Sequence, residues 1–146
     1  MSQVVDANLA LALVLATPYS DRAQALWERW HSEEAIVFAP DLWVYEVTSA
    51  LRKAMVVTGM SFSEAENRLE TVMHLGVRLV PPTLELSQSA LRWAQRLEQT
   101  VAYDAHYLAL AEFLGCDFWT ADSRLAGGPG FDVTWTHWVG CTMGGG

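Results

Sequence analysis

Short apolar runs alternate with helical patterns along most of this chain, and that alternation constrains the fold more than any other feature. The run AIVFA at 35–39, bounded by Pro40, is continuously apolar, as is typical of a strand buried on both faces. Four further short runs share this character: Val4–Val5, 77–80, 117–120 and 131–135. The pattern predicts an α/β domain with a mainly parallel central sheet of about five short strands flanked by helices.

The segments between these runs have helical spacing and recognisable ends. SFSE at 61–64 is a capping box, and Gly115 is suited to close a helix at its C-terminus. We expect helices over 9–15, 20–30, 42–57, 61–74, 83–98 and 104–115. With no internal repeat or linker, residues 1–140 are predicted to form one domain, and the Gly-rich tail 141–146 to be disordered.

The charge balance restricts what the chain can bind. Nine Lys and Arg against seventeen Asp and Glu give a formal net charge of −8. Proteins that hold nucleic acid by broad electrostatic attraction normally carry a basic surface, which this composition does not favour. An enzyme that gathers acidic side chains around a cation is compatible with it.

Cysteine usage and the N-terminus indicate a cytoplasmic protein. Cys116 and Cys141 are the only cysteines and lie in neither a CxxC motif nor a Cys/His cluster, which argues against a zinc site and a disulfide framework. The N-terminus lacks the basic segment of a secretory signal, and the apolar run 9–16 is too short to span a bilayer.

Four carboxylates occupy positions where the predicted fold would bring side chains together. Asp6 directly follows the first strand, Asp122 follows the strand 117–120, and Asp104 begins the helix that leads into that strand. Glu46 lies inside a helix among bulky apolar neighbours. In parallel sheets ligands bind beyond the carboxyl ends of the strands, where the loops converge.

Each acid also has a purely structural explanation. Asp6, Asp104 and Asp122 could cap helices or form turns, because their side-chain oxygens readily accept backbone N–H groups. Glu46 could be a solvated helical acid near Lys53. Taken together, however, the four suggest an all-oxygen site for Mg²⁺ or Mn²⁺, since close carboxylates repel one another unless a cation neutralises them. Such a site suits metal-assisted hydrolysis of a phosphodiester.

Four stretches resemble, in chain order, the motifs of PIN-domain nucleases, in particular the VapC-type toxins of toxin–antitoxin modules. They are VVDANLAL at 4–11, PDLWVYEVTSALRKA at 40–54, YDAHYLALAEFLG at 103–115 and FWTADSRL at 118–125. No single motif is specific, but the ordered set is, and only about 58–100 lacks a distinctive motif. The resemblance implies a PIN-like three-layer fold.

The resemblance also implies an activity and partners. It makes Asp6, Glu46, Asp104 and Asp122 the catalytic, metal-binding acids of a Mg²⁺-dependent endoribonuclease. It further implies that the enzyme is a homodimer inhibited by a cognate antitoxin protein. Asn8 and Thr120 match polar positions that support the carboxylates, by orienting a carboxylate or a water.

Two cations are candidates for contact with the RNA. Lys53, the only lysine, lies two turns after Glu46 on the same helical stripe, and Arg124 follows Asp122 closely. Either side chain could meet a phosphate or could be an ordinary surface cation. His106, beside Asp104, is interpreted as a packed or partly exposed residue, because metal-assisted hydrolysis needs no histidine.

A binding or regulatory module is the alternative to a nuclease. A phosphoryl-receiver domain also gathers acids at strand ends, but it needs a lysine late in the chain, and none follows Lys53. A PIN-like scaffold without catalysis would not need all four acids. The motifs GxSxG, HExxH and the P-loop of other hydrolase and nucleotide-binding classes are absent from the sequence.

Overall fold

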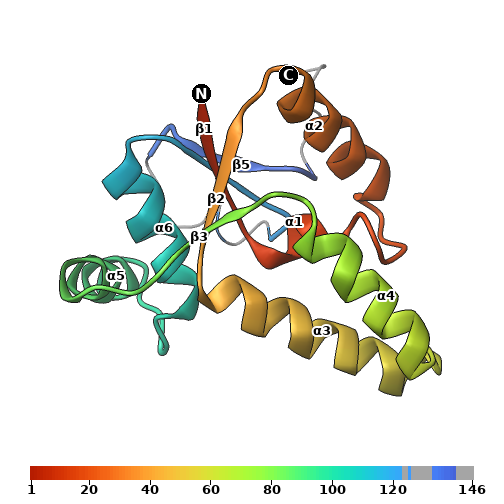
Figure 1. Cartoon of the computed structure of the whole chain (residues 1–146). Helices are drawn as coiled ribbons and strands as arrows, with labels where there is room; N and C mark the ends of the chain where they lie inside the picture. The colour runs from red at the N-terminus through yellow and green to blue at the C-terminus, as the bar shows by residue number, and fades with distance from the viewer. Residues whose placement is uncertain (123–124, 126–132, 141–146) are drawn as a thin grey trace.

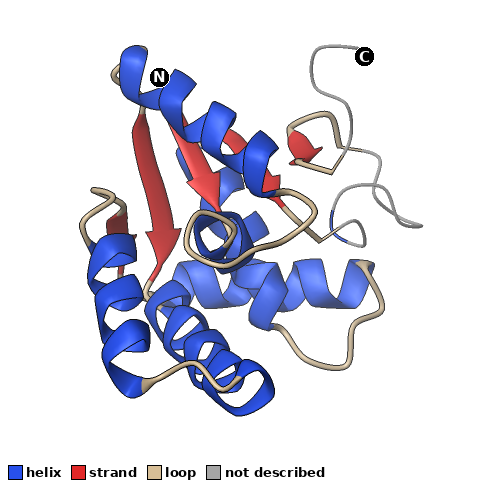
Figure 2. Cartoon of the chain, turned by 90° about the vertical axis from the view of Figure 1, so that its right-hand side faces the viewer, coloured by secondary structure: helices blue, strands red, loops and turns tan. Residues whose placement is uncertain are grey.

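The computed structural model describes residues 1–122, 125 and 133–140, and shows a five-stranded sheet between layers of helices (Figures 1 and 2). The strands are β1 Ser2–Val5, β2 Ile36–Pro40, β3 Arg78–Val80, β4 Asp117–Thr120 and β5 Thr136–Trp138. The helices are α1 Ala7–Leu11, α2 Ser20–Ser32, α3 Leu42–Thr58, α4 Phe62–Met73, α5 Leu84–Arg96 and α6 Tyr103–Leu114. The predicted α/β class with a parallel sheet flanked by helices is confirmed.

The sheet is covered on both faces, as the continuous apolar runs predict. Successive side chains of a strand point to opposite faces. Val4 and Phe118 accordingly belong to the core that contains α6, while Val5 belongs to the core that contains Leu26 and Trp30 of α2. Figure 1 shows α2 on one side of the sheet, with α5 and α6 on the other.

The strand order places β1 at the centre of the sheet. All neighbouring strands pair in parallel, in the order β3-β2-β1-β4-β5. The chain proceeds outward from β1 through β2 and β3, and then returns to add β4 on the other side of β1. The order therefore reverses between β1 and β4, where the register aligns Val5 with Trp119. Crevices at such switch points are the usual ligand sites of open α/β sheets.

The first helix begins earlier than the sequence pattern predicts. We expect a helix over 9–15, whereas α1 covers Ala7–Leu11 and residues 12–15 continue in turns. The Asp6 carboxylate accepts the Leu9 N–H at 2.9 Å, so the helix starts directly at the end of β1. The apolar stripe indicated the helix, but this cap decides where it begins.

The last strand lies later than predicted. We expect a strand over 131–135, whereas β5 is Thr136–Trp138 and the described residues 133–135 precede it. The Trp135 ring packs edge-on against Trp93 of α5, with ring centroids 5.6 Å apart. Its carbonyl accepts the Phe118 N–H at 2.8 Å, so Trp135 leads into the strand rather than ending it.

Within the described residues, no helix combines the length and apolar character needed to cross a membrane. The C-terminal segment 141–146, for which we predict disorder, lies outside those residues.

Candidate active site

One cavity of about 220 Å³ opens at the carboxyl ends of β1 and β4, where the strand order reverses. All four acids selected from the sequence line it. Its lining consists of Asp6, Ala7, Asn8, Glu46, Ser49, Asp104, Tyr107, Asp122 and Leu125. We call this space the acidic cavity. The fold therefore brings together residues up to 116 positions apart in the chain (Asp6 and Asp122).

Asp6 is the most deeply buried of the four acids, with only 5% of its surface exposed. One carboxylate oxygen accepts the Leu9 N–H, and the other accepts the Thr120 hydroxyl. Burial raises the pKa of Asp6 from 3.8 to about 7, even though both hydrogen bonds favour the ionised form. The nearby charges of Glu46 and Asp122 add to the rise. Asp6 is therefore a helix cap and a cavity-lining acid at once.

Thr120 connects the ends of the two central strands. It is fully buried at the last position of β4 and donates its hydroxyl to Asp6. Its oxygen also accepts the Asp122 N–H at 2.9 Å. Thr120 thus fixes the Asp6 carboxylate and the backbone of Asp122, which are the contacts expected of a residue that supports the acids.

Glu46 reaches the acidic cavity from the middle of α3, where it is half-buried. The Tyr107 hydroxyl donates to its Oε1 at 2.5 Å. Burial raises the pKa of Glu46, the hydrogen bond from Tyr107 opposes the rise, and the charge of Asp104 adds to it. Glu46 is therefore not the freely solvated helical acid of the structural alternative.

Asp104 lies in the first turn of α6 and lines the same cavity. The helix begins at Tyr103, one residue before the predicted start, and Ala102 occupies the N-cap position. Asp104 is therefore not the residue at the cap. The N-terminal turn of a helix favours a negative side chain, because the helix dipole places partial positive charge there.

The four carboxylates share a cavity without forming a compact ligand set. Among the described residues, no group of three or more His, Cys, Asp or Glu side chains is arranged to hold a metal ion. Asp6 and Glu46 are each held instead by a hydroxyl group, from Thr120 and Tyr107 respectively. The donors are nonetheless all oxygens, and one is a deeply buried carboxylate, which fits a hard divalent cation in chemistry.

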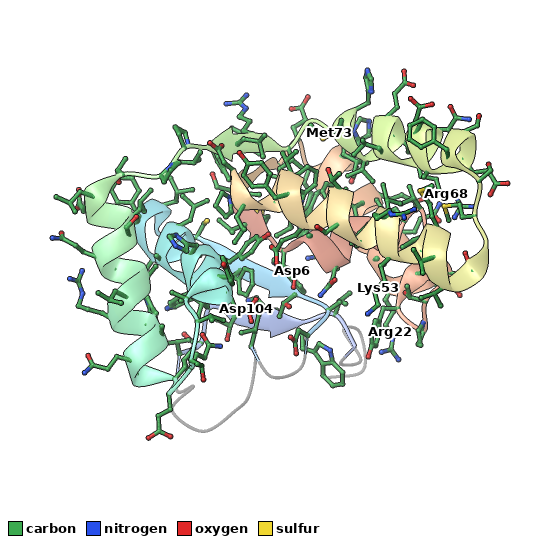
Figure 3. All side chains as sticks on the ribbon, turned by 90° about the horizontal axis from the view of Figure 1, so that it is seen from below. Asp6, Arg22, Lys53, Arg68, Met73 and Asp104 are labelled. Carbon is green, nitrogen blue, oxygen red and sulfur yellow. The ribbon has the colours of Figure 1, made fainter. Side chains whose placement is uncertain are left out.

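A second, mostly apolar hollow of about 420 Å³ adjoins the acidic cavity and shares Asn8 with it. Exposed Lys53 lines this hollow together with Leu15, Tyr19 and Val57. In Figure 3, Lys53 lies toward the C-terminal end of α3, to the right of Asp6. Lys53 therefore lies beside the acids rather than among them.

Two further side chains, His106 and Arg124, lie near the acids in the sequence. His106 lines a separate hollow with Tyr45 and Pro81, away from the acidic cavity, and burial lowers its pKa. Arg124, the second predicted RNA contact, lies outside the described residues.

Comparison with known proteins identifies the family. The PIN domain matches residues 4–128. Ribonuclease VapC1 of Mycobacterium tuberculosis is 36% identical over 108 residues, which is 74% of this chain and 79% of that protein. This chain belongs to the VapC-type PIN-domain ribonucleases. Ribonuclease VapC3 of Pyrobaculum aerophilum is 35% identical over 127 residues, 86% of this chain and 93% of that protein.

A solved structure supports the same fold for this VapC-type chain. The crystal structure of VapBC2 from Rickettsia felis, bound to a DNA fragment from the promoter, superposes with a TM-score of 0.69. The match covers 94% of this chain and 99% of that one at 10% sequence identity. At that identity the likeness concerns the fold alone, and it agrees with the three-layer architecture.

Two polar residues of the acidic cavity, Tyr107 and Ser49, are not among the site residues that the sequence patterns indicate. A signal exists for Tyr107, because it lies three positions after Asp104 and such residues share a helix face. Its partner Glu46 is 61 positions away, and no local pattern reveals that contact. The same signal exists for Ser49, which lies three positions after Glu46 on α3.

The raised pKa of Asp6 predicts a pH-dependent stability. Between pH 3.8 and about 7 the folded protein holds more protons than the unfolded chain, so stability falls as the pH rises through this window. Asp6→Asn cannot ionise and should remove this slope. In EDTA at pH 8 the free energy of unfolding should be larger for the variant than for wild type, because a difference of one in pKa corresponds to roughly 1.4 kcal/mol. At pH 4 the two free energies should be similar.

Urea unfolding at several pH values measures the effect. The same change at exposed Asp21 is the matched control and should leave the slope unchanged. Parallel stability curves for wild type and Asp6→Asn would contradict the assigned burial of the charge.

Proposed function

We propose that this protein is a metal-dependent endoribonuclease that hydrolyses RNA phosphodiester bonds and acts in the cytoplasm as the toxin of a type II toxin–antitoxin pair. The observation that carries the proposal is the convergence of four distant acids on one cavity at the switch point of the sheet. The relatives VapC1 and VapC3 are named as ribonucleases, which supports the proposed reaction and substrate class.

Asp6, Glu46, Asp104 and Asp122 are the residues we propose to hold Mg²⁺, with Mn²⁺ as a substitute. A divalent ion bound there would neutralise the carboxylates, lower the pKa of a water molecule and offset charge on the phosphate. Their chemistry fits, because hard cations of this class prefer carboxylate oxygens. Asp6 in particular is a buried carboxylate that is held by two uncharged donors, Leu9 and Thr120.

The protein's own contribution is to fix these acids before substrate arrives. Asp6 is held at both oxygens by Leu9 and Thr120, and Glu46 is held by Tyr107. Asn8 lines the same cavity, which supports the proposal that it orients a carboxylate or a water. Groups that are already positioned need not be ordered during the reaction, which is an important source of catalytic power.

Cleavage assays test the activity. RNA should be cut in Mg²⁺ or Mn²⁺ and not in EDTA, and Asp6→Asn and Asp104→Asn should each lower the rate by at least about 100-fold, since changes even to groups around a metal ligand cost 10–100-fold. Exposed Asp21→Asn is the control. Cleavage that survives both chelation and the two substitutions would reject the mechanism.

The same assay separates the proposal from its alternative. A PIN-like module that only binds or regulates would cut none of a panel of structured RNAs with either metal. It would also show no difference between wild type and the two aspartate variants.

Lys53 is proposed to contact an RNA phosphate from the hollow beside the acidic cavity. A local cation matters here because the whole chain carries a net charge of −8. Lys53→Met should weaken RNA binding to a similar extent for different sequences, and lower the slope of log K against log salt by about 1. Arg124 is proposed for a similar contact.

Fluorescence anisotropy at several salt concentrations measures both quantities. Arg52→Met is the matched control on the same helix, since Arg52 borders a different hollow between α3 and α4. An unchanged salt dependence for Lys53→Met would remove this residue from the proposed RNA path.

We further propose that the protein is a homodimer and that a cognate antitoxin inhibits it. Exposed apolar side chains on α5 and α6, among them Leu91 and Phe113, support a subunit interface. The likeness to VapBC2, a toxin–antitoxin complex, supports an antitoxin partner. An Arg or Lys of the antitoxin among the carboxylates would take the place of the cation.

Light scattering should give the mass of a dimer for the protein alone. The complex with the antitoxin should not cleave RNA. Substituting that Arg or Lys of the antitoxin by Ala should restore cleavage. A monomer, or a crystal structure of the complex with the acidic cavity left open, would contradict these partner proposals.

A further inference from the structure

We propose that Tyr107 is a positioning residue that keeps Glu46 at the acidic cavity, where its carboxylate can serve a bound metal ion. Its hydroxyl engages Oε1 of Glu46, which leaves the other carboxylate oxygen available to the cavity. The inference rests on the proposed metal-dependent function. It concerns a residue that the four-acid pattern does not include.

The position of the Tyr107 hydroxyl is fixed by packing. The side chain is 1% exposed and belongs to the core. Its ring lies against Phe118 of β4, with centroids 5.9 Å apart. Tyr107 therefore has little freedom to move, and the hydroxyl is a stationary donor at the wall of the acidic cavity.

The Glu46 side chain, in contrast, is favoured to turn away from the acidic cavity unless it is held. It is half-buried on α3 and shares the acidic cavity with Asp104, whose negative charge acts on it. An unheld glutamate in this setting gains hydration and reduces repulsion by turning toward solvent. The hydrogen bond from a fixed partner on α6 opposes that movement and connects the two helices that carry Glu46 and Asp104.

The direction of the hydrogen bond follows from the charges around it. Burial, and then the negative charges of Glu46, Asp6 and Asp104, raise the pKa of Tyr107. The phenol therefore keeps its proton, and Glu46 is the acceptor. Partners of this kind orient metal-binding carboxylates, and their loss typically lowers metal affinity by about 10–100-fold.

Tyr107→Phe tests the inference because it removes the hydroxyl and keeps the ring. Calorimetric titration of Mn²⁺ into the metal-free full-length protein should show about 10-fold or greater weakening, within the range for such partners. In cleavage assays the Mn²⁺ concentration for half-maximal rate should rise by a similar factor, while KM for RNA stays near the wild-type value. Tyr45→Phe on α3 is the matched control, since Tyr45 is 70% exposed.

A double-mutant cycle with Glu46→Gln separates positioning from general stabilisation. If Tyr107 acts through Glu46, adding Tyr107→Phe to Glu46→Gln should weaken Mn²⁺ binding little further. A merely structural tyrosine would instead add its full effect and lower the thermal midpoint in both backgrounds.

The outcomes distinguish this inference from the proposed function. Wild type that binds Mn²⁺ and cleaves RNA, together with a Tyr107→Phe variant of equal Mn²⁺ affinity, would overturn the positioning role alone. Additive effects in the double-mutant cycle would overturn it as well. Wild type that neither binds Mn²⁺ nor cleaves RNA would overturn the proposed function and this inference together.

Discussion

The Asp6 carboxylate lies almost out of contact with water at the end of the central strand, and the surrounding structure accommodates that charge. An isolated buried carboxylate is costly, so its oxygens need donors. Leu9 supplies one from the first turn of α1, and Thr120 supplies the other from β4. Both donors exist only because β1 runs directly into a helix and pairs with β4. The charge is thus tied to the topology of the sheet.

The two hydroxyl contacts belong to two parts of the site, one at the ends of strands and one on helices. Asp6, Thr120 and Asp122 are linked at the ends of adjacent strands. Glu46 and Asp104 come from helices, and Tyr107 joins α6 to α3 through Glu46. Each hydroxyl thus holds one acid at the cavity, and burial raises the pKa values of both Asp6 and Glu46.

The net charge of the chain also acquires a local meaning in the structure. A formal charge of −8 disfavours a broad RNA-binding face, and Lys53 stands beside the acidic cavity rather than within a basic patch. Attraction of a polyanion to such a surface has to depend on neutralising the acids. We propose that the same cavity takes a cation in the active protein and a cationic side chain from an inhibitor.

The sequence alone determined the fold class, because continuous apolar runs such as 35–39 have to be buried on both faces and only a helix-covered sheet does that. It also indicated the acids that line the cavity, since Asp6 and Asp122 follow strands and the ordered motifs cover nearly the whole chain. Local patterns fixed helix ends less well. The helix at 9–15 begins at Ala7, and the last strand is Thr136–Trp138, preceded by residues 133–135 of the predicted strand.

Only the tertiary structure decided which groups touch. The pairing of β1 with β4 brings Thr120 to Asp6 across 114 positions, and the packing of α6 brings Tyr107 to Glu46 across 61. Periodicity is a property of neighbours in the chain, and it carries no information about contacts at such separations. For that reason the acids could be chosen from the sequence, and Thr120 from the family resemblance, while the contact between Tyr107 and Glu46 required the folded chain.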